Sequence, residues 1–376
     1  MERLIILLLA ALVGATPACL TAAPKPSETP AVAVFEAKKN IPHASVRIPA
    51  LLMTSKGTLI AIAEGRDKAT DQAGNDLLVA RSKDQGKTWS KPTIAYEQGD
   101  DSCNNPCLVQ DTKSGRVFLF FQTFPAGGKE FSGLPIGPKD PKGNRLKFLT
   151  SDDDGMTWSQ PIDVSHELKP ANAATCASGP GIGIQLQKGE FAGRLVIPFN
   201  SQDAQRNFVN WVAFSDDAGQ TWKRGAEVPQ EGMQLNEVQV AESADGSLYL
   251  NSRRWRSGAP LRKVSWSRDG GVTWAKAMED AALPEPVCQG SLLSATAGGK
   301  PAIFFLNPVG KGRANGTLRR SEDGGKTWAE STLIIPGPFA YSSMAQVGKD
   351  IGVLYEPAGN TTVLYRRITL EPAAGR

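Results

Sequence analysis

Short hydrophobic runs, separated by polar stretches that contain Gly and Pro, extend along most of the chain. Residues 59–63, 77–81 and 211–214 form three such runs, each about as long as a β-strand. The run at 362–368 near the C-terminus has the same character. The 38 Gly and 26 Pro residues suit the tight turns that many short strands require. The pattern therefore predicts an all-β protein.

One eight-residue pattern, Ser-x-Asp-x-Gly-x-Thr-Trp, occurs five times, and each copy is called a box below. The boxes begin at Ser82, Ser151, Ser215, Ser267 and Ser321, separated by 69, 64, 52 and 54 residues. Five of the eight Trp residues lie in boxes, which chance does not produce. The Asp can accept hydrogen bonds from amides of its own turn, and the Gly supplies a backbone conformation that other residues resist. Each box therefore predicts a turn between two strands.

Repeats of about 50 residues are typical of propellers, in which four-stranded blades bury their faces against neighbouring blades. Residues 43–372 are long enough for six blades, five with a box and one without. We therefore expect a six-bladed β-propeller of four-stranded antiparallel blades. The strand at 362–368 is expected to close the ring by pairing with N-terminal sequence. A second expected strand, at 344–354, precedes it.

The N-terminus has the composition of an export signal. Arg3 precedes an apolar run at 4–13, and small residues follow it up to Ala23. We predict a signal peptide at 1–23, a Pro-rich linker at 24–42 and an exported protein, either periplasmic or secreted. The run is too short to span a bilayer and no later segment is apolar enough, which argues against a transmembrane anchor. Cys19 leaves a lipoprotein as the alternative.

Charge and rare residues narrow the chemistry. The formal net charge is +4, but Lys and Arg are interleaved with Asp and Glu, which argues against nucleic acid as a partner. The chain has only two histidines, His43 and His166, which argues against histidine-based hydrolysis and histidine-bound metals. The boxes lack the terminal Glu of a calcium loop, so they are interpreted as structural.

Four cysteines follow Cys19 in the sequence. In an oxidising compartment they can pair in three ways, and the sequence does not select one. The spacing of the first two lacks the partner Cys or His pair of a zinc site. These cysteines are Cys103, Cys107, Cys176 and Cys288.

The boxes, together with Arg47-Ile48-Pro49, resemble those of the exo-α-sialidase (neuraminidase) family of Asp-box (BNR) repeat propellers. The resemblance extends from about Val46 to Glu356, with the motifs in the family order. It implies a six-bladed propeller with a site on the central axis. It also implies hydrolysis of terminal sialic acids, which are sugars with a carboxylate on the anomeric carbon.

The resemblance implies three arginines that hold this carboxylate: Arg47, Arg253 in Leu-Asn-Ser-Arg, and Arg313 after Asn307-Pro308. Arginine suits the task because its planar guanidinium binds a carboxylate with two hydrogen bonds and keeps its charge. Glu356, in Leu-Tyr-Glu, matches the family glutamate that orients the first of these arginines. Arg66 is expected to help bind the substrate.

The same resemblance implies a Tyr nucleophile, Tyr341, partnered by Glu237, where most glycosidases use two carboxylates. A carboxylate nucleophile would be repelled by the charge on the anomeric carbon, whereas a neutral Tyr is not, provided that a base takes its proton. The leaving oxygen also needs an acid. Asp71, five residues beyond Arg66, matches the family position best, with Asp67 and Asp76 as alternatives.

These expectations combine into a retaining exo-α-sialidase that acts on sialylated glycans, glycoproteins or glycolipids and needs no cofactor and no metal. One rival keeps the chemistry but takes a deaminated nonulosonic acid. The other rival is a catalytically silent propeller that binds glycans. A loop insertion at 131–145, rich in Gly, Pro and Lys, is expected to shape the rim of the site.

Overall fold

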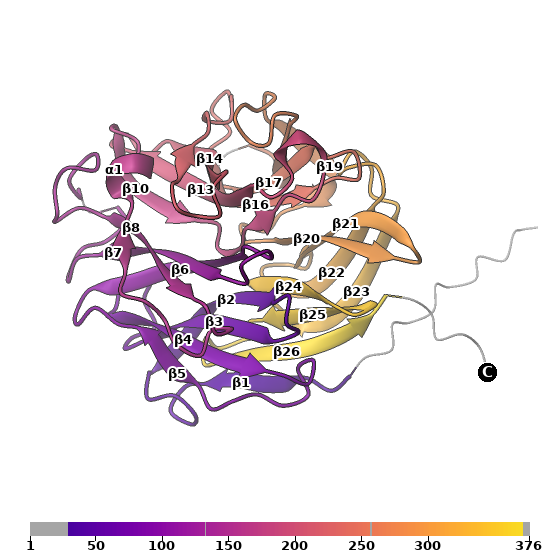
Figure 1. Ribbon diagram of the computed structural model, residues 1–376, viewed down its shortest axis with the longest axis horizontal. Helices are drawn as coiled ribbons and strands as arrows, with labels where there is room; N and C mark the ends of the chain where they lie inside the picture. The colour runs from indigo at the N-terminus through magenta and orange to yellow at the C-terminus, as the bar shows by residue number, and fades with distance from the viewer. Residues whose placement is uncertain (1–28, 132, 256–257, 371–376) are drawn as a thin grey trace, which may run out of the picture.

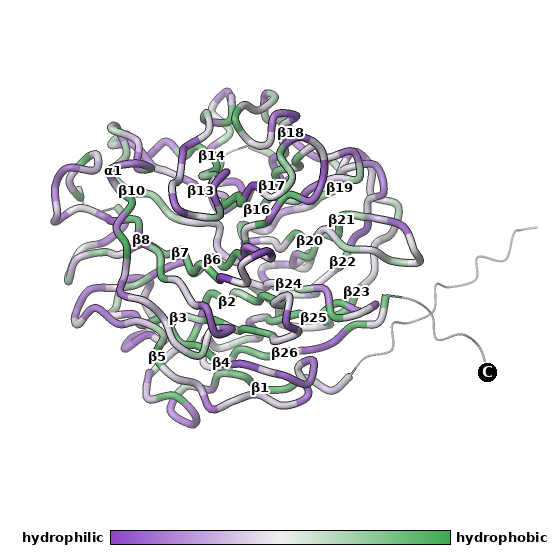
Figure 2. The backbone as a smooth tube through the Cα atoms, in the orientation of Figure 1, coloured by the Kyte–Doolittle hydropathy of each residue, from purple (hydrophilic) through white to green (hydrophobic). Residues whose placement is uncertain are grey.

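The computed structural model describes residues 29–131, 133–255 and 258–370. Within these ranges six small sheets surround a central axis, as predicted (Figure 1). The innermost strands of neighbouring blades contact one another around the ring. Figure 2 shows hydrophobic colour concentrated in the strands and hydrophilic colour in many of the outer turns.

The strands of blades 1 to 3 are given from the axis outward. Blade 1 contains β2 (Ser45–Met53), β3 (Leu59–Arg66), β4 (Asn75–Ser82) and β5 (Thr93–Tyr96). Blade 2 contains β6 (Ser102–Gln110), β7 (Val117–Phe124), β8 (Arg145–Ser151) and β9 (Ile162–Asp163), with β11 (Gly181–Ile182) parallel to β6. Blade 3 contains β10 (Ala173–Ser178), β13 (Leu195–Asp203), β14 (Phe208–Ser215) and β15 (Lys223–Arg224), with β12 (Ile184–Gln185) paired to β13.

Blades 4 to 6 follow the same order. Blade 4 contains β16 (Leu235–Glu242), β17 (Leu248–Arg254), β18 (Leu261–Ser267) and β19 (Met278–Pro284). Blade 5 contains β20 (Ser291–Ala297), β21 (Lys300–Pro308), β22 (Ala314–Ser321) and β23 (Glu330–Pro338). Blade 6 contains β24 (Ser342–Val347), β25 (Asp350–Tyr355), β26 (Thr362–Thr369) and β1 (Val32–Glu36).

Two short helices complete the described structure. They are α1 (Ser165–Leu168) and the 3-10 helix η1 (Gly189–Phe191). Neither these nor any other helix of the described ranges has the length and hydrophobicity needed to cross a membrane.

The ring closes through the two ends of the propeller, as the sequence predicts. The expected strand at 362–368 is β26, and it pairs antiparallel with β1. Strand β1 lies inside the stretch 24–42 that the sequence suggests as a linker, so the folded propeller begins before residue 43. The expected signal peptide at 1–23 and Cys19 lie outside the described residues.

Each box lies between the third and fourth strands of its blade. In blade 6 those positions belong to β26 and β1, which come from opposite ends of the chain. No turn connects them, and this is why the sixth blade has no box.

The box of blade 3 shows how the pattern specifies its turn. The Asp217 carboxylate accepts hydrogen bonds from the Ser215 hydroxyl and from the amide and hydroxyl of Thr221. Gly219 has a φ of +84°, a left-handed conformation that favours glycine. A Cβ atom at this position would lie 2.1 Å from the Phe118 ring of blade 2. The Gly therefore serves both the turn and the close approach of the next blade.

The hydrophobic core is divided among the gaps between blades. Six clusters of buried residues each combine side chains of two neighbouring blades. Box tryptophans take part, since Trp222 contacts the rings of Phe118 and Phe120 across one gap. Each blade is therefore stabilised mainly by its neighbours, as expected for a repeat architecture.

Two further expectations are corrected by the structure. The stretch 344–354 is not one strand, because Gly348, with a φ of +61°, turns the chain between β24 and β25. The four cysteines that could have paired are all free and buried.

Candidate functional site

A pocket lies at the axis, where the inner strands of the blades converge. Residues of all six blades, or of the loops next to them, contribute to its lining. Seven of the site residues expected from the sequence line it: Arg47, Arg66, Asp71, Glu237, Arg253, Arg313 and Tyr341.

The inner strands are irregular where they reach this pocket. The register of β2 shifts after Arg47, where Ile48 has a φ of +57°. Strand β6 shifts after Asn104, and β16 shifts after Leu235. Bulges of this kind end the regular pairing and redirect side chains, and they occur often beside active sites. The same irregularity in three blades aims polar side chains at the axis.

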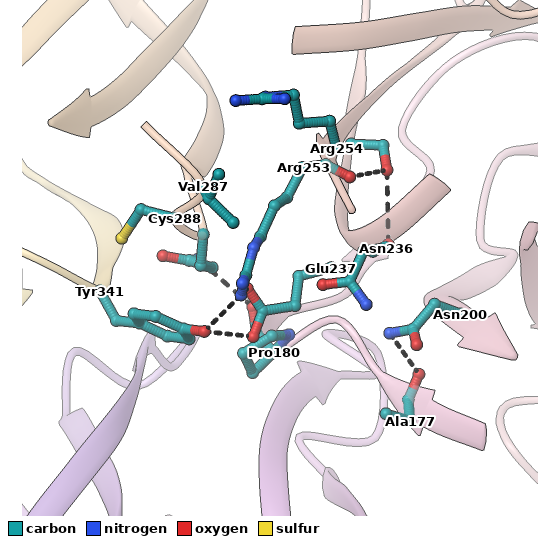
Figure 3. Close-up of polar contacts among 12 residues, drawn as sticks. Ala177, Pro180, Asn200, Asn236, Glu237, Arg253, Arg254, Val287, Cys288 and Tyr341 are labelled. Carbon is teal, nitrogen blue, oxygen red and sulfur yellow. Dashed lines mark hydrogen bonds and ion pairs between the residues drawn. The ribbon is translucent and has the colours of Figure 1, made fainter. Parts of the chain in front are cut away.

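The most compact cluster in the pocket joins Tyr341, Glu237 and Arg253 (Figure 3). The Tyr341 hydroxyl donates to Glu237 Oε1 at 2.5 Å. Arg253 Nη1 donates to Glu237 Oε2 at 2.7 Å and to the Tyr341 hydroxyl oxygen at 2.9 Å. All three side chains are buried. A hydroxyl therefore lies between a carboxylate that can take its proton and a cation that can stabilise its oxygen.

The electrostatic environment keeps Tyr341 protonated at rest. Burial raises the pKa of Tyr341 well above its ordinary value, and the charge of Glu237 adds to the rise. Arg253, Arg313 and Arg47 act in the opposite direction, because each favours the phenolate. The guanidinium carbons of Arg47 and Arg313 lie 4.9 and 5.2 Å from the centroid of the ring. A reactive oxyanion at Tyr341 thus requires proton transfer to a nearby base.

Arg47 is held by Glu356, which comes from the end of β25. Arg47 Nη2 and Nε both donate to Glu356 Oε2, at 2.7 and 3.2 Å. The other carboxylate oxygen accepts the amide of Ile48 at 2.7 Å. Glu356 therefore fixes the arginine side chain and the bulge that carries it.

Arg313 lies on the loop between β21 and β22 and is the most exposed of the three arginines. Its Nη2 donates to the carbonyl oxygen of Val287 at 3.1 Å. It forms no ion pair with a carboxylate of the described residues.

Arg66 is fully buried and links two acids. Its Nε and Nη2 donate to Glu64 Oε2 at 2.8 and 2.6 Å, and its Nη1 donates to Asp71 Oδ1 at 2.9 Å. The Asp71 side chain is 69% exposed, whereas that of Glu64 is fully buried. Asp71 therefore sits at the open side of the pocket, on the loop between β3 and β4, with Arg66 beneath it.

The alternative residues considered from the sequence lie elsewhere. Asp76 pairs with His43, at 2.9 Å between Oδ2 and Nε2, and neither Asp76 nor Asp67 lines the pocket.

The pocket also contains residues that the sequence did not suggest. Glu130 is half-buried on the long loop between β7 and β8, next to the insertion expected at 131–145. Burial raises the pKa of Glu130 to about 7, Glu237 and Asp71 add to the rise, and Arg253 opposes it. Phe131 stacks on Trp255, with ring centroids 5.4 Å apart, so the insertion does contribute to the wall of the pocket.

The site thus offers a ligand several cations around a tyrosine and its base. This arrangement suits an anionic ligand whose reacting atom is attacked by a hydroxyl. In residues 29–131, 133–255 and 258–370, no three His, Cys, Asp or Glu side chains lie together as a metal site would require.

Comparison with known proteins gives a consistent result. Residues 57–354 match the family of the BNR repeat-like domain. The sialidase of Micromonospora viridifaciens is 33% identical over 339 residues, covering 86% of this chain and 51% of that protein. The sialidase of Bacteroides fragilis is 33% identical over 335 residues, covering 83% of this chain and 60% of that protein. The chain thus spans between half and two thirds of the length of these two relatives.

A solved structure extends the similarity to three dimensions. The Hadza microbial sialidase Hz136 superposes with a TM-score of 0.81 at 30% identity, covering 90% of this chain and 68% of that one. The repeated boxes, the six-bladed ring and these similarities agree, and the chain belongs to the sialidase family of BNR-repeat propellers.

Proposed function

We propose that this protein is a retaining exo-α-sialidase that removes terminal sialic acids from glycans, glycoproteins or glycolipids. The observation that carries the proposal is the Tyr341 hydroxyl, hydrogen-bonded to Glu237 and Arg253 in a pocket lined by Arg47 and Arg313. This combination supplies a neutral nucleophile, its base and an anion clamp in one place.

Substrate binding begins with the carboxylate of the sugar. Arg47, Arg253 and Arg313 approach the pocket from three different blades, so together they can surround one anion. Arg47 and Arg253 each have a glutamate partner, which reduces the net positive charge of the pocket. The bound carboxylate places the anomeric carbon beside Tyr341.

In the first step the Tyr341 oxygen bonds to the anomeric carbon as the bond to the leaving oxygen breaks. Glu237 takes the phenolic proton, and Asp71 gives a proton to the leaving oxygen. In the second step Asp71 takes a proton from water, whose oxygen bonds to the anomeric carbon. The bond between the anomeric carbon and the Tyr341 oxygen breaks at the same time, and this oxygen recovers its proton from Glu237. Two displacements at one carbon retain its configuration.

The exposure of Asp71 agrees with this role, because the acid must reach an oxygen that still belongs to the rest of the glycan. Arg66 holds Asp71 from below and supports the substrate side of the pocket. We propose that the reaction requires no cofactor and that the protein is exported, periplasmic or secreted, with residues 1–23 as its signal peptide.

The proposal is tested with a fluorogenic α-sialoside and a fluorinated sialosyl fluoride. The wild-type protein should release the fluorophore, and the inhibitor should add one sugar mass to the peptide that contains Tyr341. A parallel assay with the deaminated nonulosonic acid distinguishes the two sugars by their kcat/KM values. Binding without turnover or adduct would identify a silent glycan-binding propeller, and an adduct on a carboxylate would refute the Tyr mechanism.

A further inference from the structure

Arg47, Arg253 and Arg313, called the clamp from here on, are supported in two different ways. Arg47 and Arg253 each lie 2.7 Å from a glutamate oxygen. Arg313 instead donates to a main-chain carbonyl and has no ion pair within the described residues. A carbonyl can orient a guanidinium without neutralising it, so Arg313 keeps its full charge for a ligand. Its position therefore depends on whatever fixes the Val287 carbonyl.

Val287 lies in the loop 285–290, which connects β19 of blade 4 to β20 of blade 5. Its φ is +59°, in the left-handed region where a β-branched residue is rarely found. Such a conformation persists only when the surrounding structure enforces it. Cys288 belongs to one buried cluster with Tyr341, and Figure 3 shows Val287 next to Cys288.

The backbone beside Val287 is held by buried charges, and Glu285 also lies 3.7 Å from the Nε atom of Arg254. Glu285 Oε1 accepts the amide of Cys288 at 2.6 Å, and Glu285 Oε2 accepts the amide of Arg254 at 3.2 Å. Arg262 Nη1 donates to the carbonyl of Cys288 at 2.8 Å and lies 4.0 Å from Glu285 Oε1. The side chains of Glu285 and Arg262 are both fully buried. Both polar groups of the Cys288 backbone, next to Val287, are thus held by one pair of charges.

The same loop also reaches the residue after Tyr341. The Gln289 side chain donates to the Ser342 carbonyl at 3.0 Å and accepts the Ser342 amide at 3.1 Å. The loop therefore links one arginine of the clamp to the segment that carries Tyr341.

We propose that Glu285, together with Arg262, is a positioning residue that sets Arg313 through the Val287 carbonyl. This inference rests on the proposed function for its ligand, the sialic acid carboxylate. A carboxylate thus supports Arg313 only indirectly, through the loop that carries Val287. Glu285 fixes the loop, the loop fixes the arginine, and the charge of the arginine remains available to the substrate.

The first experiment compares Glu285→Gln with the wild type in the sialoside assay. A clamp arginine displaced by about 1 Å should raise KM by about 10- to 100-fold, with a smaller change in kcat. Glu279→Gln is the matched control, because Glu279 pairs with Lys263, the neighbour of Arg262, and does not line the pocket. An unchanged KM in Glu285→Gln would overturn the inference.

Two further variants isolate the role of the buried charges. Val287→Gly keeps these charges and suits the left-handed backbone, so its melting temperature and its KM should both stay close to the wild-type values, and a large rise in KM would show that the Val287 side chain sets Arg313 instead. In an Arg313→Ala background, Glu285→Gln should add little to the KM change already present. An equal KM effect with and without Arg313 would show that Glu285 acts by another route.

Crystallography tests the inference independently of any substrate. In Glu285→Gln the Arg313 side chain should lose its contact with the Val287 carbonyl, and an intact contact would refute the inference. A wild-type protein that fails to release sialic acid would refute the proposed function alone, and this structural arm would still decide the role of Glu285.

Discussion

The box turns and the axial site are both polar clusters, but they are built on different scales. In the first box, Asp84 bonds the amide and hydroxyl of Thr88, four residues away, in an exposed turn. At the axis, Tyr341 bonds Glu237 from 104 residues away, and Arg47 bonds Glu356 from 309 residues away. A box therefore organises itself from one short segment, whereas the site exists only when the ring is complete.

This difference assigns separate tasks to the two regions. Box residues determine how the blades turn and pack, so changes there should alter stability with little effect on the chemistry. Site residues hold opposite charges close together in a buried pocket, so changes there should alter catalysis.

The largest effect is expected at the axis, from Tyr341→Phe. The change removes the attacking oxygen, so kcat should fall at least ~1000-fold. The free energy of unfolding should change by only about 1 to 3 kcal/mol, because one hydrogen-bonding hydroxyl is lost from a retained ring. Tyr96→Phe is the control, since it removes a hydroxyl that bonds Gln98 away from the pocket. Near-normal turnover of Tyr341→Phe would show that catalysis does not depend on the Tyr341 hydroxyl at the axis.

The second largest effect is expected at a box, from Gly219→Ala. The new Cβ would meet the Phe118 ring in a left-handed backbone, so the protein should lose about 2 to 5 kcal/mol of stability. Gly57→Ala isolates the backbone part, because Gly57 has a φ of +83° with no atom within 4 Å of the new Cβ. That variant should lose about 1 to 2 kcal/mol. Chemical denaturation measures both, and equal losses would mean that the contact between blades contributes nothing.

A smaller effect is expected near neutral pH, at Glu130. Its pKa of about 7 means that this carboxyl gains its negative charge as the pH rises from 6 to 8. The added charge should repel an anionic sugar and weaken binding of a 2,3-dehydro sialic acid analogue by about 3- to 10-fold. Glu130→Gln should bind this analogue with little change over the same range, as titration calorimetry would show. A wild-type affinity that does not depend on pH would contradict this role.

The smallest effect is expected in acid, at the boxes. Hydrogen bonds from the side chain and amide of Thr88, and from Ser82, lower the pKa of Asp84 to about 2. Because the ordinary pKa is about 4, the ionised form stabilises the fold above pH 4, and this stabilisation is lost as the pH falls toward 2. Asp84→Asn should therefore narrow the difference in melting temperature between pH 5 and pH 2.5. A parallel decline in both proteins would show that the box carboxylate is not responsible.

The difference in scale also explains what the sequence could predict. The boxes, the six blades and the pairing of 362–368 follow from repeats and local turn chemistry, and the structure contains them. The site residues were expected from short motifs on separate blades, and seven of them line one pocket. Their mutual contacts could not be derived from any one segment, because the partners come from distant strands.

Three residues in or near the site were not predicted, each for a different reason. Glu64 lies two positions before Arg66, and alternation along a strand places both side chains on one face, so this partner was open to prediction. Glu130 belongs to a long loop without a repeated counterpart in the other blades. Glu285 has no motif, because its role depends on a left-handed Val287 that only the folded loop reveals.

The closure of blade 6 has a consequence for synthesis. Strand β1 is the first described strand to leave the ribosome, and β26, to which it pairs, is the last. Thr29 and Arg367, which are joined by a hydrogen bond, are 338 residues apart. During translation β1 therefore has no partner strand until β26 has been made, and the ring can close only after this last strand emerges. Removing β1 would expose the outer edge of β26, and removing β26 would leave β1 without a partner strand, so closure of the ring depends on both ends of the chain.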